Sequence, residues 1–142
     1  MDPFNLARFR AAQSSVYERA RAELLAGAKR THWMWFLFPQ LRGLGLSETA
    51  RLYGIGSQAE AAAYLADPVL GPRLIALSEI ALGHADRTAR ELFGSPDDLK
   101  LRSCATLFAA PPDAPPVFGR VLDQFFAGMA DPRTQALLAG RA

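Results

Sequence analysis

The chain has 142 residues, of which 50% are apolar and 21% are charged, as in an ordinary globular protein that folds into one domain. Its single cysteine, Cys104, excludes an internal disulfide and a zinc site built from several thiolates, and makes the cytoplasm the expected location. The net charge of +2, without a concentrated basic stripe, argues against nucleic acid as a partner. No signal-peptide pattern and no run of about 18 apolar residues is present, so we expect no contact with a membrane.

Helix starts are marked along the chain by a capping residue followed by proline. The pattern occurs at Asp2-Pro3, Asp67-Pro68, Ser95-Pro96 and Asp131-Pro132. After the first of these, apolar or neutral residues recur every three or four positions as far as Gly27, which predicts one long amphipathic helix. Capping-box patterns at 57–60 and 88–91 predict further helices at about 58–66 and 89–93.

The remaining elements are also expected to be helical. Short helical pieces are predicted from Thr31 to Pro39 and from Ser47 to Tyr53. A helix that begins at Pro68 has the core positions Leu70, Leu74, Leu77 and Ala81, one from Ser95 reaches toward Phe108, and an apolar stripe runs from Phe118 to Met129. A short helix ends the chain. No alternation of β-branched residues competes with these patterns. We therefore predict an all-α fold, a compact single-domain helical bundle of about six to eight helices over residues 1–142.

The segment THWMWFLFPQ, residues 31–40, holds both tryptophans and one of the two histidines. Trp33 and Trp35 fall on different faces of a helix, so one can line a pocket while the other packs in the core. His32 can act as an acid or a base near neutral pH, but no carboxylate lies near it in sequence, and a packed structural histidine is the alternative. Gln13 interrupts the apolar stripe of the first helix, and its amide either bonds to loop backbone or points into a pocket.

A second group of polar residues lies in the segment SPDDLKLRS, residues 95–103. Asp97 and Asp98 occupy a first helical turn, where the helix dipole alone favours carboxylates. In the functional interpretation, Lys100 and Arg102 recognise an anion while Asp97 or Asp98 contacts a sugar hydroxyl or a water. Adjacent helical residues point about 100° apart, so the two carboxylates are not expected to share a proton.

The usual cofactor motifs are absent. The chain has no Walker loop, no G-x-G-x-x-G motif and no H-x-x-x-H pair, so neither a cofactor nor a metal site is predicted. Cys104 begins an apolar stretch, and we expect it to be a buried structural thiol.

Three blocks of the sequence resemble the bacterial domain-of-unknown-function 1810 family, whose members often carry the legacy label calpastatin. The blocks are THWMWFLFPQLRGLG (31–45), AYLADPVLGPRL (63–74) and FGSPDDLKLRSCATLF (93–108). The resemblance implies a compact, mostly helical domain in the bacterial cytoplasm. It does not imply calpain inhibition, because that inhibitor is disordered and this composition forms a core. Motifs of the family fall on Gln13, His32, Trp33, Trp35, Pro39, Gln40, Tyr53, Asp97, Asp98, Lys100 and Ser103, with no activity attached.

We predict that a pocket between the His32–Gln40 block and the Asp97–Ser103 helix binds a small anionic or ribose- or phosphate-bearing metabolite. The catalytic candidates are His32, Asp97 and Asp98. The ligand-binding candidates are Gln13, Trp33, Trp35, Gln40, Tyr53, Lys100, Arg102 and Ser103. One alternative is an N-glycosidase or hydrolase that acts on ADP-ribose-like metabolites, and another is a protein or nucleic-acid interaction module without catalysis. Neither a reaction nor an oligomeric state is assigned from the sequence.

Overall fold

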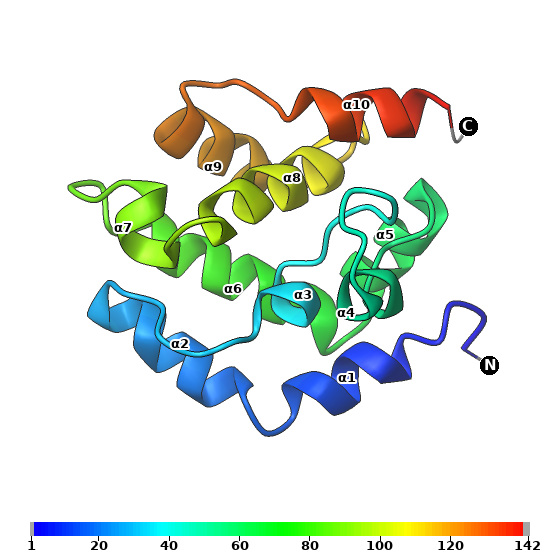
Figure 1. Ribbon diagram of the computed structural model, residues 1–142, viewed down its shortest axis with the longest axis horizontal. Coiled ribbons are helices and arrows are strands. Elements are labelled where there is room, and N and C mark those ends of the chain that lie inside the picture. Colours follow the sequence, from blue (N-terminus) through cyan, green and yellow to red (C-terminus); the bar gives the residue numbers. More distant parts are fainter. Residues whose placement is uncertain (1, 141–142) are drawn as a thin grey trace.

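The computed structural model describes residues 2–140, and every regular element in this range is helical (Figure 1). The helices are α1 (Ala7–Gln13), α2 (Tyr17–Ala26), α3 (Met34–Leu37), α4 (Glu48–Leu52), α5 (Gln58–Ala66), α6 (Leu70–Leu82), α7 (Ala89–Phe93), α8 (Asp97–Ala109), α9 (Pro116–Phe126) and α10 (Pro132–Ala139). The predicted all-α class is confirmed, although this range holds ten helices and not six to eight. None of the helices within residues 2–140 has the length and apolar character needed to cross a membrane.

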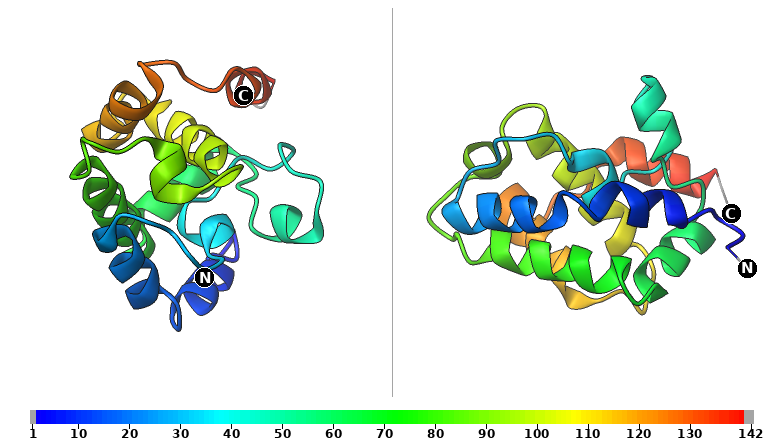
Figure 2. Two further views of the ribbon diagram at one scale, coloured as in Figure 1. Left: turned by 60° about the vertical axis from the view of Figure 1, so that its left-hand side comes forward. Right: turned by 90° about the horizontal axis from the view of Figure 1, so that it is seen from below.

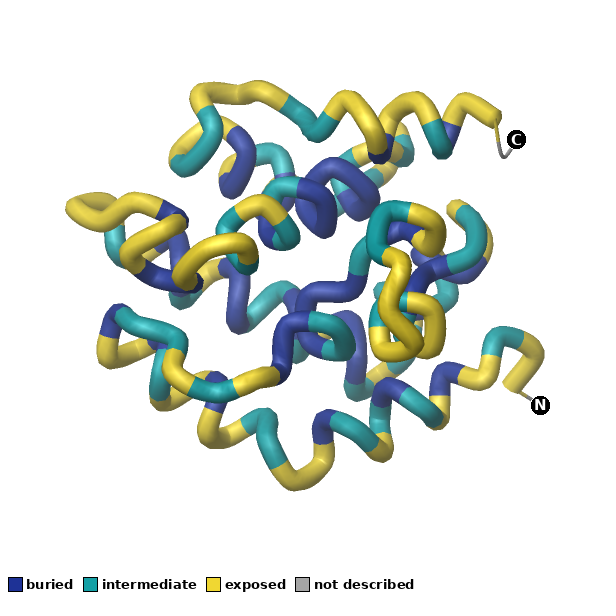
Figure 3. Tube along the Cα trace, in the orientation of Figure 1, coloured by how far each residue is buried: buried dark blue, intermediate teal, exposed yellow. Residues whose placement is uncertain are grey.

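The core forms around α6 and α8, the two longest helices. α6 packs against α2, α5 and α9, and α8 packs against α5, α7, α9 and α10 (Figure 1). The predicted core positions Leu70, Leu74, Leu77 and Ala81 are completely buried, which confirms the stripe read from the sequence. Cys104 on α8 is buried as expected, and burial raises the pKa of its thiol well above the ordinary range. Figure 3 shows that burial is concentrated where these helices meet.

The single long N-terminal helix predicted from the sequence is wrong, because the chain breaks at residues 14–16 into α1 and α2. Val16 has φ −123° and ψ −13°, outside the helical range. Ser14 and Ser15 at the break are poor helix formers. α1 contacts α3 whereas α2 contacts α6. The break therefore lets the N-terminal segment bend around the core, as Figure 1 shows.

Three of the predicted helix caps are confirmed. The side chains of Ser57, Thr88 and Asp131 each accept a hydrogen bond from the backbone N–H three residues further on. The Thr88 cap forms a full capping box with Glu91. The bounds predicted for the two capping-box helices agree with α5 and α7.

Several boundaries differ from the prediction. α6 begins at Leu70 and not at Pro68, and the short helix predicted from Thr31 to Pro39 is limited to Met34–Leu37. α8 begins at Asp97 with Pro96 as its N-cap residue and no side-chain cap, so Ser95 does not play the predicted role. α9 ends at Phe126, because the backbone turns left-handed at Ala127, with φ 53°. Met129 therefore lies outside the helix and is 63% exposed, and the predicted apolar stripe ends before it.

Residues 42–54, which we call the arm, project from the helical body and include α4 (Figure 2). A parallel bridge between Leu41 and Ile55 closes the base of the arm. There the Arg42 N–H donates to the Ile55 carbonyl at 2.8 Å, and the Ile55 N–H donates to the Gln40 carbonyl at 2.9 Å. The two ends of the arm are thereby held together.

Arg8 of α1 ties the arm to the body. Its Nε donates to the Leu52 carbonyl at 2.7 Å, and its Nη2 donates to the Gly54 carbonyl at 3.1 Å. The same guanidinium pairs with the Glu60 carboxylate of α5 at 2.7 Å, and the two side chains are only 9% and 6% exposed. A buried charge needs such a partner, so Arg8 and Glu60 hold this position together.

Candidate functional site

The aromatic segment is anchored by Glu23 of α2. Its Oε1 accepts hydrogen bonds from the N–H groups of Arg30 (2.8 Å) and Thr31 (3.0 Å) and from the indole Nε1 of Trp33 (3.0 Å). Its Oε2 accepts from the Thr31 hydroxyl at 2.6 Å. Burial acts to raise the pKa of Glu23, but these hydrogen bonds outweigh it and lower the pKa from 4.5 to about 2. An ionised carboxylate therefore fastens residues 30–33 to α2.

Trp33 is a core residue. It has no exposed surface, and its ring packs against Phe38 and Phe93 with centroids 6.0 Å and 6.3 Å away. The Lys29 ammonium lies 5.0 Å from the ring centroid. The expectation that one of the two tryptophans packs in the core is confirmed. With no surface to offer a ligand, Trp33 is left out of the candidate site.

Trp35, unlike Trp33, reaches the surface of the protein. It is partly exposed and lies within α3, whereas Trp33 precedes the helix with a non-helical backbone of φ −149° and ψ 8°. The Lys100 ammonium of α8 lies 4.3 Å from the centroid of the Trp35 ring, a favourable cation–π distance. This contact joins the aromatic segment, residues 31–40, to the polar segment, residues 95–103.

Asp97 holds Lys100 in position through a bridge of charges. One carboxylate oxygen, Oδ2, lies 2.8 Å from the Lys29 ammonium, and the other, Oδ1, lies 3.1 Å from the Lys100 ammonium. Burial acts to raise the pKa of Asp97, but the hydrogen bonds and charges of the two lysines outweigh it and hold the pKa below its ordinary value. The Lys29 side chain is 5% exposed and that of Lys100 is 23% exposed. Of the two lysines in this bridge, Lys100 is thus the one that remains open to a ligand.

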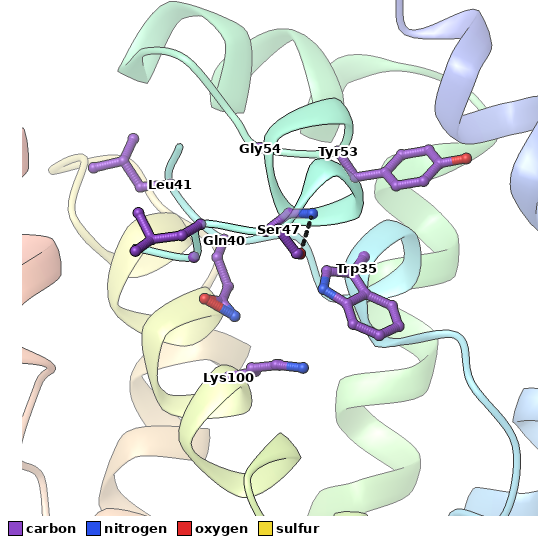
Figure 4. Close-up of a pocket in the computed structure, with 10 residues that line it drawn as sticks. Trp35, Gln40, Leu41, Ser47, Tyr53, Gly54 and Lys100 are labelled. Carbon is purple, nitrogen blue, oxygen red and sulfur yellow. Dashed lines mark hydrogen bonds between the residues drawn. The ribbon is translucent and has the colours of Figure 1, made fainter. Parts of the chain in front are cut away.

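A pocket of about 220 Å³ lies beside the Trp35–Lys100 contact (Figure 4). Its lining includes Trp35, Gln40, Leu41, Ser47, Tyr53 and Lys100, which come from α3, the segment after it, the arm and α8. Figure 4 shows the Gln40 amide and the Lys100 ammonium directed toward the same space as the Trp35 indole. The Gln40 side chain makes no hydrogen bond within residues 2–140. The lining has one cationic side chain and no carboxylate or histidine among the residues described.

A second hollow of about 540 Å³ adjoins this pocket, and Gln40 and Lys100 line both. Its other polar lining residues are Arg102 and Ser103 of α8, and Asp131 and Arg133 at the start of α10. The Ser103 hydroxyl donates to the Leu99 carbonyl at 3.2 Å.

The arginines of the second hollow have no acidic partner. Arg102 donates from Nε and Nη2 to the carbonyls of Met129 (2.7 Å) and Ala130 (2.8 Å), which fixes the guanidinium without neutralising it. Within residues 2–140, neither Arg102 nor Arg133 has a carboxylate within 4.0 Å. Asp131 also lines the hollow, and its Oδ2 is occupied in capping α10 through Thr134.

Gln13 lies elsewhere, in the core. Its amide donates to the Phe36 carbonyl at 2.7 Å and to the Tyr64 hydroxyl at 3.0 Å, and its oxygen accepts from Arg73 at 3.3 Å. Gln13 is bonded to backbone, as in the structural alternative considered for it, but this backbone belongs to α3 and not to a loop. Gln13 supports the backbone of α3 without reaching the pocket lining.

The catalytic candidates do not meet in the pocket. His32 is exposed and makes no side-chain hydrogen bond within the described residues. Asp98 is partly buried, and its Oδ1 is buried without a hydrogen-bond partner among the residues described. Both carboxylate oxygens of Asp97 are taken up by lysines. The structure therefore brings Trp35, Gln40, Tyr53 and Lys100 together around the pocket, with Arg102 and Ser103 next to it, and leaves His32 and Asp98 outside its lining.

Sequence reasoning assigned no role to Glu23, Lys29 or the arm residue Ser47. Glu23 lies off the apolar stripe of its helix and has the pattern of a solvent-exposed residue. The one feature of the sequence that indicates its role is the loop after Gly27, because the backbone N–H groups of that loop need a hydrogen-bond acceptor. Lys29 is two residues before the aromatic segment but pairs with a residue 68 positions later, which no local pattern reports.

The chain matches the model of a protein family described as "Protein of unknown function (DUF1810)" over residues 3–138. It is 52% identical to a chain of known structure, the conserved hypothetical protein Rv1873 from Mycobacterium tuberculosis, whose crystal structure was determined at 1.38 Å. The two structures agree with a TM-score of 0.95 over 97% of this chain and 99% of the other. Among curated proteins, none matches this chain.

Proposed function

The chain belongs to the DUF1810 family, as its three sequence blocks indicated, and we propose that it binds a small metabolite with a flat ring and an anionic group such as phosphate. The observation that carries the proposal is the Lys100 ammonium 4.3 Å from the centre of the Trp35 ring, beside a pocket of about 220 Å³ that both residues line. A partly exposed cation and a partly exposed indole at one pocket suit a ligand that is both flat and negatively charged.

The pocket offers a contact for each part of such a ligand. Trp35 and Tyr53 supply aromatic surface against which a ring can pack. The Lys100 ammonium has three N–H donors, and its bond to Asp97 leaves donors for an anion. The unpartnered Gln40 amide can both donate and accept, which suits a hydroxyl or a ring heteroatom.

We propose binding without a reaction. A hydrolase needs a general acid or base within hydrogen-bond reach of the bound substrate. The pocket lining contains neither a carboxylate nor a histidine among the described residues, and Asp97 is held in two ion pairs. This distribution gives the glycosidase alternative neither of the two carboxylates that glycoside hydrolysis ordinarily uses. An interaction module is also less well supported, because Trp35, Gln40, Tyr53 and Lys100 gather at one concavity and are not spread over the surface.

The test is an NMR titration of the ¹⁵N-labelled protein with inorganic phosphate, ribose 5-phosphate and adenosine monophosphate. We expect the indole N–H signal of Trp35 to shift with the ligand that binds. The Trp33 indole is the internal control, because it is buried and bonded to Glu23. Lys100→Met keeps the length of the side chain and removes its charge, and should weaken binding at least about tenfold, as expected for a hydrogen bond to a charged group.

Arg90→Gln is the matched control, since Arg90 is an exposed cation of α7 that lines neither the pocket nor the hollow. It should bind as the unaltered protein does. The proposal fails if no probe shifts the Trp35 signal at millimolar concentration, or if Lys100→Met and Arg90→Gln have equal effects. A thermal-shift measurement checks the same variants, because a ligand at a hundredfold excess over its dissociation constant stabilises the native state by about 2.7 kcal/mol.

A further inference from the structure

The pocket proposed above is small for a whole metabolite. Pockets for drug-sized ligands are typically about 300–1,000 Å³. A volume of about 220 Å³ is below that range, and the adjoining hollow adds about 540 Å³. Gln40 and Lys100 line both spaces, so the pocket and the hollow meet at these two side chains.

The hollow has a positive charge that the protein leaves without an acidic partner. Arg102 is held by two backbone carbonyls, so its guanidinium is positioned in advance and its charge is not cancelled. Arg133 is exposed and makes no ion pair or side-chain hydrogen bond within residues 2–140. Lys100 adds a third cation, shared with Asp97. Against these stands one lining carboxylate, Asp131, which is engaged in capping α10.

We propose that this hollow is a subsite for a second anionic group, so that the ligand belongs to the class of a flat ring joined to two phosphates, as in a nucleoside diphosphate. The inference rests on the proposed function, because it assumes that the ring occupies the pocket of Trp35 and Tyr53. In this arrangement the first phosphate meets Lys100, where the two spaces join, and the second meets Arg102 and Arg133. Arginine suits phosphate because its planar N–H groups can donate two hydrogen bonds at once.

A ligand with two phosphates accounts for the two arginines of the hollow, which a ligand confined to the small pocket does not. A single anion at Lys100 would leave Arg102 and Arg133 with no role in recognition, although both face the hollow that Lys100 lines. The hydrogen bonds from Arg102 to the carbonyls of Met129 and Ala130 also order the segment that leads into α10, and Arg133 is the second residue of that helix. One residue thus contributes charge and also places the segment that carries the second arginine.

The test compares adenosine, adenosine monophosphate, adenosine diphosphate and inorganic pyrophosphate by calorimetric titration and by the Trp35 indole signal. We expect the diphosphate to bind at least about tenfold more tightly than the monophosphate, the gain expected from one or more hydrogen bonds to charged groups. In Arg133→Gln this gain should fall below about threefold, while the affinity for the monophosphate stays within about twofold. Arg133 has no described bonds to lose, so the variant should fold normally, and Arg90→Gln again serves as the off-site control.

The outcomes separate this inference from the proposed function. If the monophosphate binds in a manner that depends on Lys100, but the diphosphate binds no more tightly, the pocket stands and the second subsite is overturned. The subsite is also overturned if the diphosphate keeps its gain in affinity over the monophosphate in Arg133→Gln. It is overturned as well if Arg90→Gln removes that gain as fully as Arg133→Gln does. If none of the four probes binds at millimolar concentration, both the subsite and the proposed function are overturned.

Discussion

Replacing Glu23 by glutamine tests whether one ionised carboxylate holds the aromatic segment in place. Glutamine has nearly the same shape, and its oxygen can keep the contacts of Oε1 with Arg30, Thr31 and Trp33. Its NH₂ group replaces Oε2 beside the Thr31 hydroxyl, which can rotate to accept from it. The substitution therefore removes the charge and leaves the geometry largely intact.

The expected loss follows from the pKa of Glu23. A fall from 4.5 to about 2 corresponds to about 3 kcal/mol of preference for the ionised form in the folded state. Glu23 is only partly buried, and solvent screening reduces this figure, so we expect Glu23→Gln to lower the free energy of unfolding by about 1–2 kcal/mol at pH 7. For a domain of this length that is a fall in melting temperature of about 3–6 °C.

The loss should depend on pH in a defined direction. The folded-state pKa is depressed, so the stabilisation by Glu23 is fully present above pH 4.5 and disappears as the pH falls toward 2. Asp2, Asp67 and Asp97 also have lowered pKa values, but they are present in both proteins and cancel from the difference. The assay is chemical denaturation of the unaltered protein and the variant between pH 3 and pH 7.

Glu79→Gln is the control, because Glu79 is exposed on α6 and makes no side-chain hydrogen bond or ion pair within residues 2–140. Its effect should stay within about 0.5 kcal/mol at every pH. The reasoning is refuted if the two variants are equally stable, or if the loss in Glu23→Gln is the same at pH 3 and pH 7.

Four further substitutions test the packing of the helical body and of the aromatic segment. Gly71→Ala should destabilise the protein by about 1–3 kcal/mol in thermal denaturation, because a Cβ at this position collides with the Leu65 carbonyl oxygen, and an unchanged melting temperature would contradict the close packing of α5 and α6. Gln13→Leu should cost about 1–3 kcal/mol by removing the hydrogen bonds that the buried amide donates to the Phe36 carbonyl and the Tyr64 hydroxyl, and a neutral result would show that the Tyr64 hydroxyl alone holds the Phe36 carbonyl. Trp33→Ala should cost about 3–5 kcal/mol and Trp35→Ala clearly less, since only Trp33 is fully buried, and equal losses would refute the division of roles between the two tryptophans.

The parts of the fold that could be predicted are those that depend on local chemistry. The caps at Ser57 and Thr88 and the stripe Leu70–Leu74–Leu77 are determined by neighbours within one or two turns, and they were predicted correctly. The break after Gln13 was missed, because the three- and four-residue spacing continues through it. Only the tertiary contacts of the Gln13 amide with Phe36 and Tyr64 show that this polar residue belongs to the core at the end of a helix.

The candidate site was predicted only in part, because local patterns identify individual residues and not the contacts between distant segments. Trp35 and Lys100 were recognised as unusual residues in separate segments, and the structure places them in contact. The wall formed by the arm was not predicted, since the position of residues 42–54 depends on Arg8 and on the Leu41–Ile55 bridge. His32 was an equally good candidate for the site in the sequence. In the structure its neighbours Thr31 and Trp33 are the residues that bond to Glu23, and His32 is exposed.

The core and the pocket are connected through Lys29, and this connection explains why two tryptophans two positions apart have different roles. Trp33 packs in the core beside the Lys29 ammonium, which is almost completely buried and needs an anionic partner. Asp97 is that partner, and its second oxygen binds Lys100. The buried end of this bridge is held by core packing, whereas the Lys100 end lies over Trp35 and lines the pocket. Because the core positions Asp97 through Lys29, Lys100 is held for an anion before any ligand arrives, which reduces the entropy lost on binding.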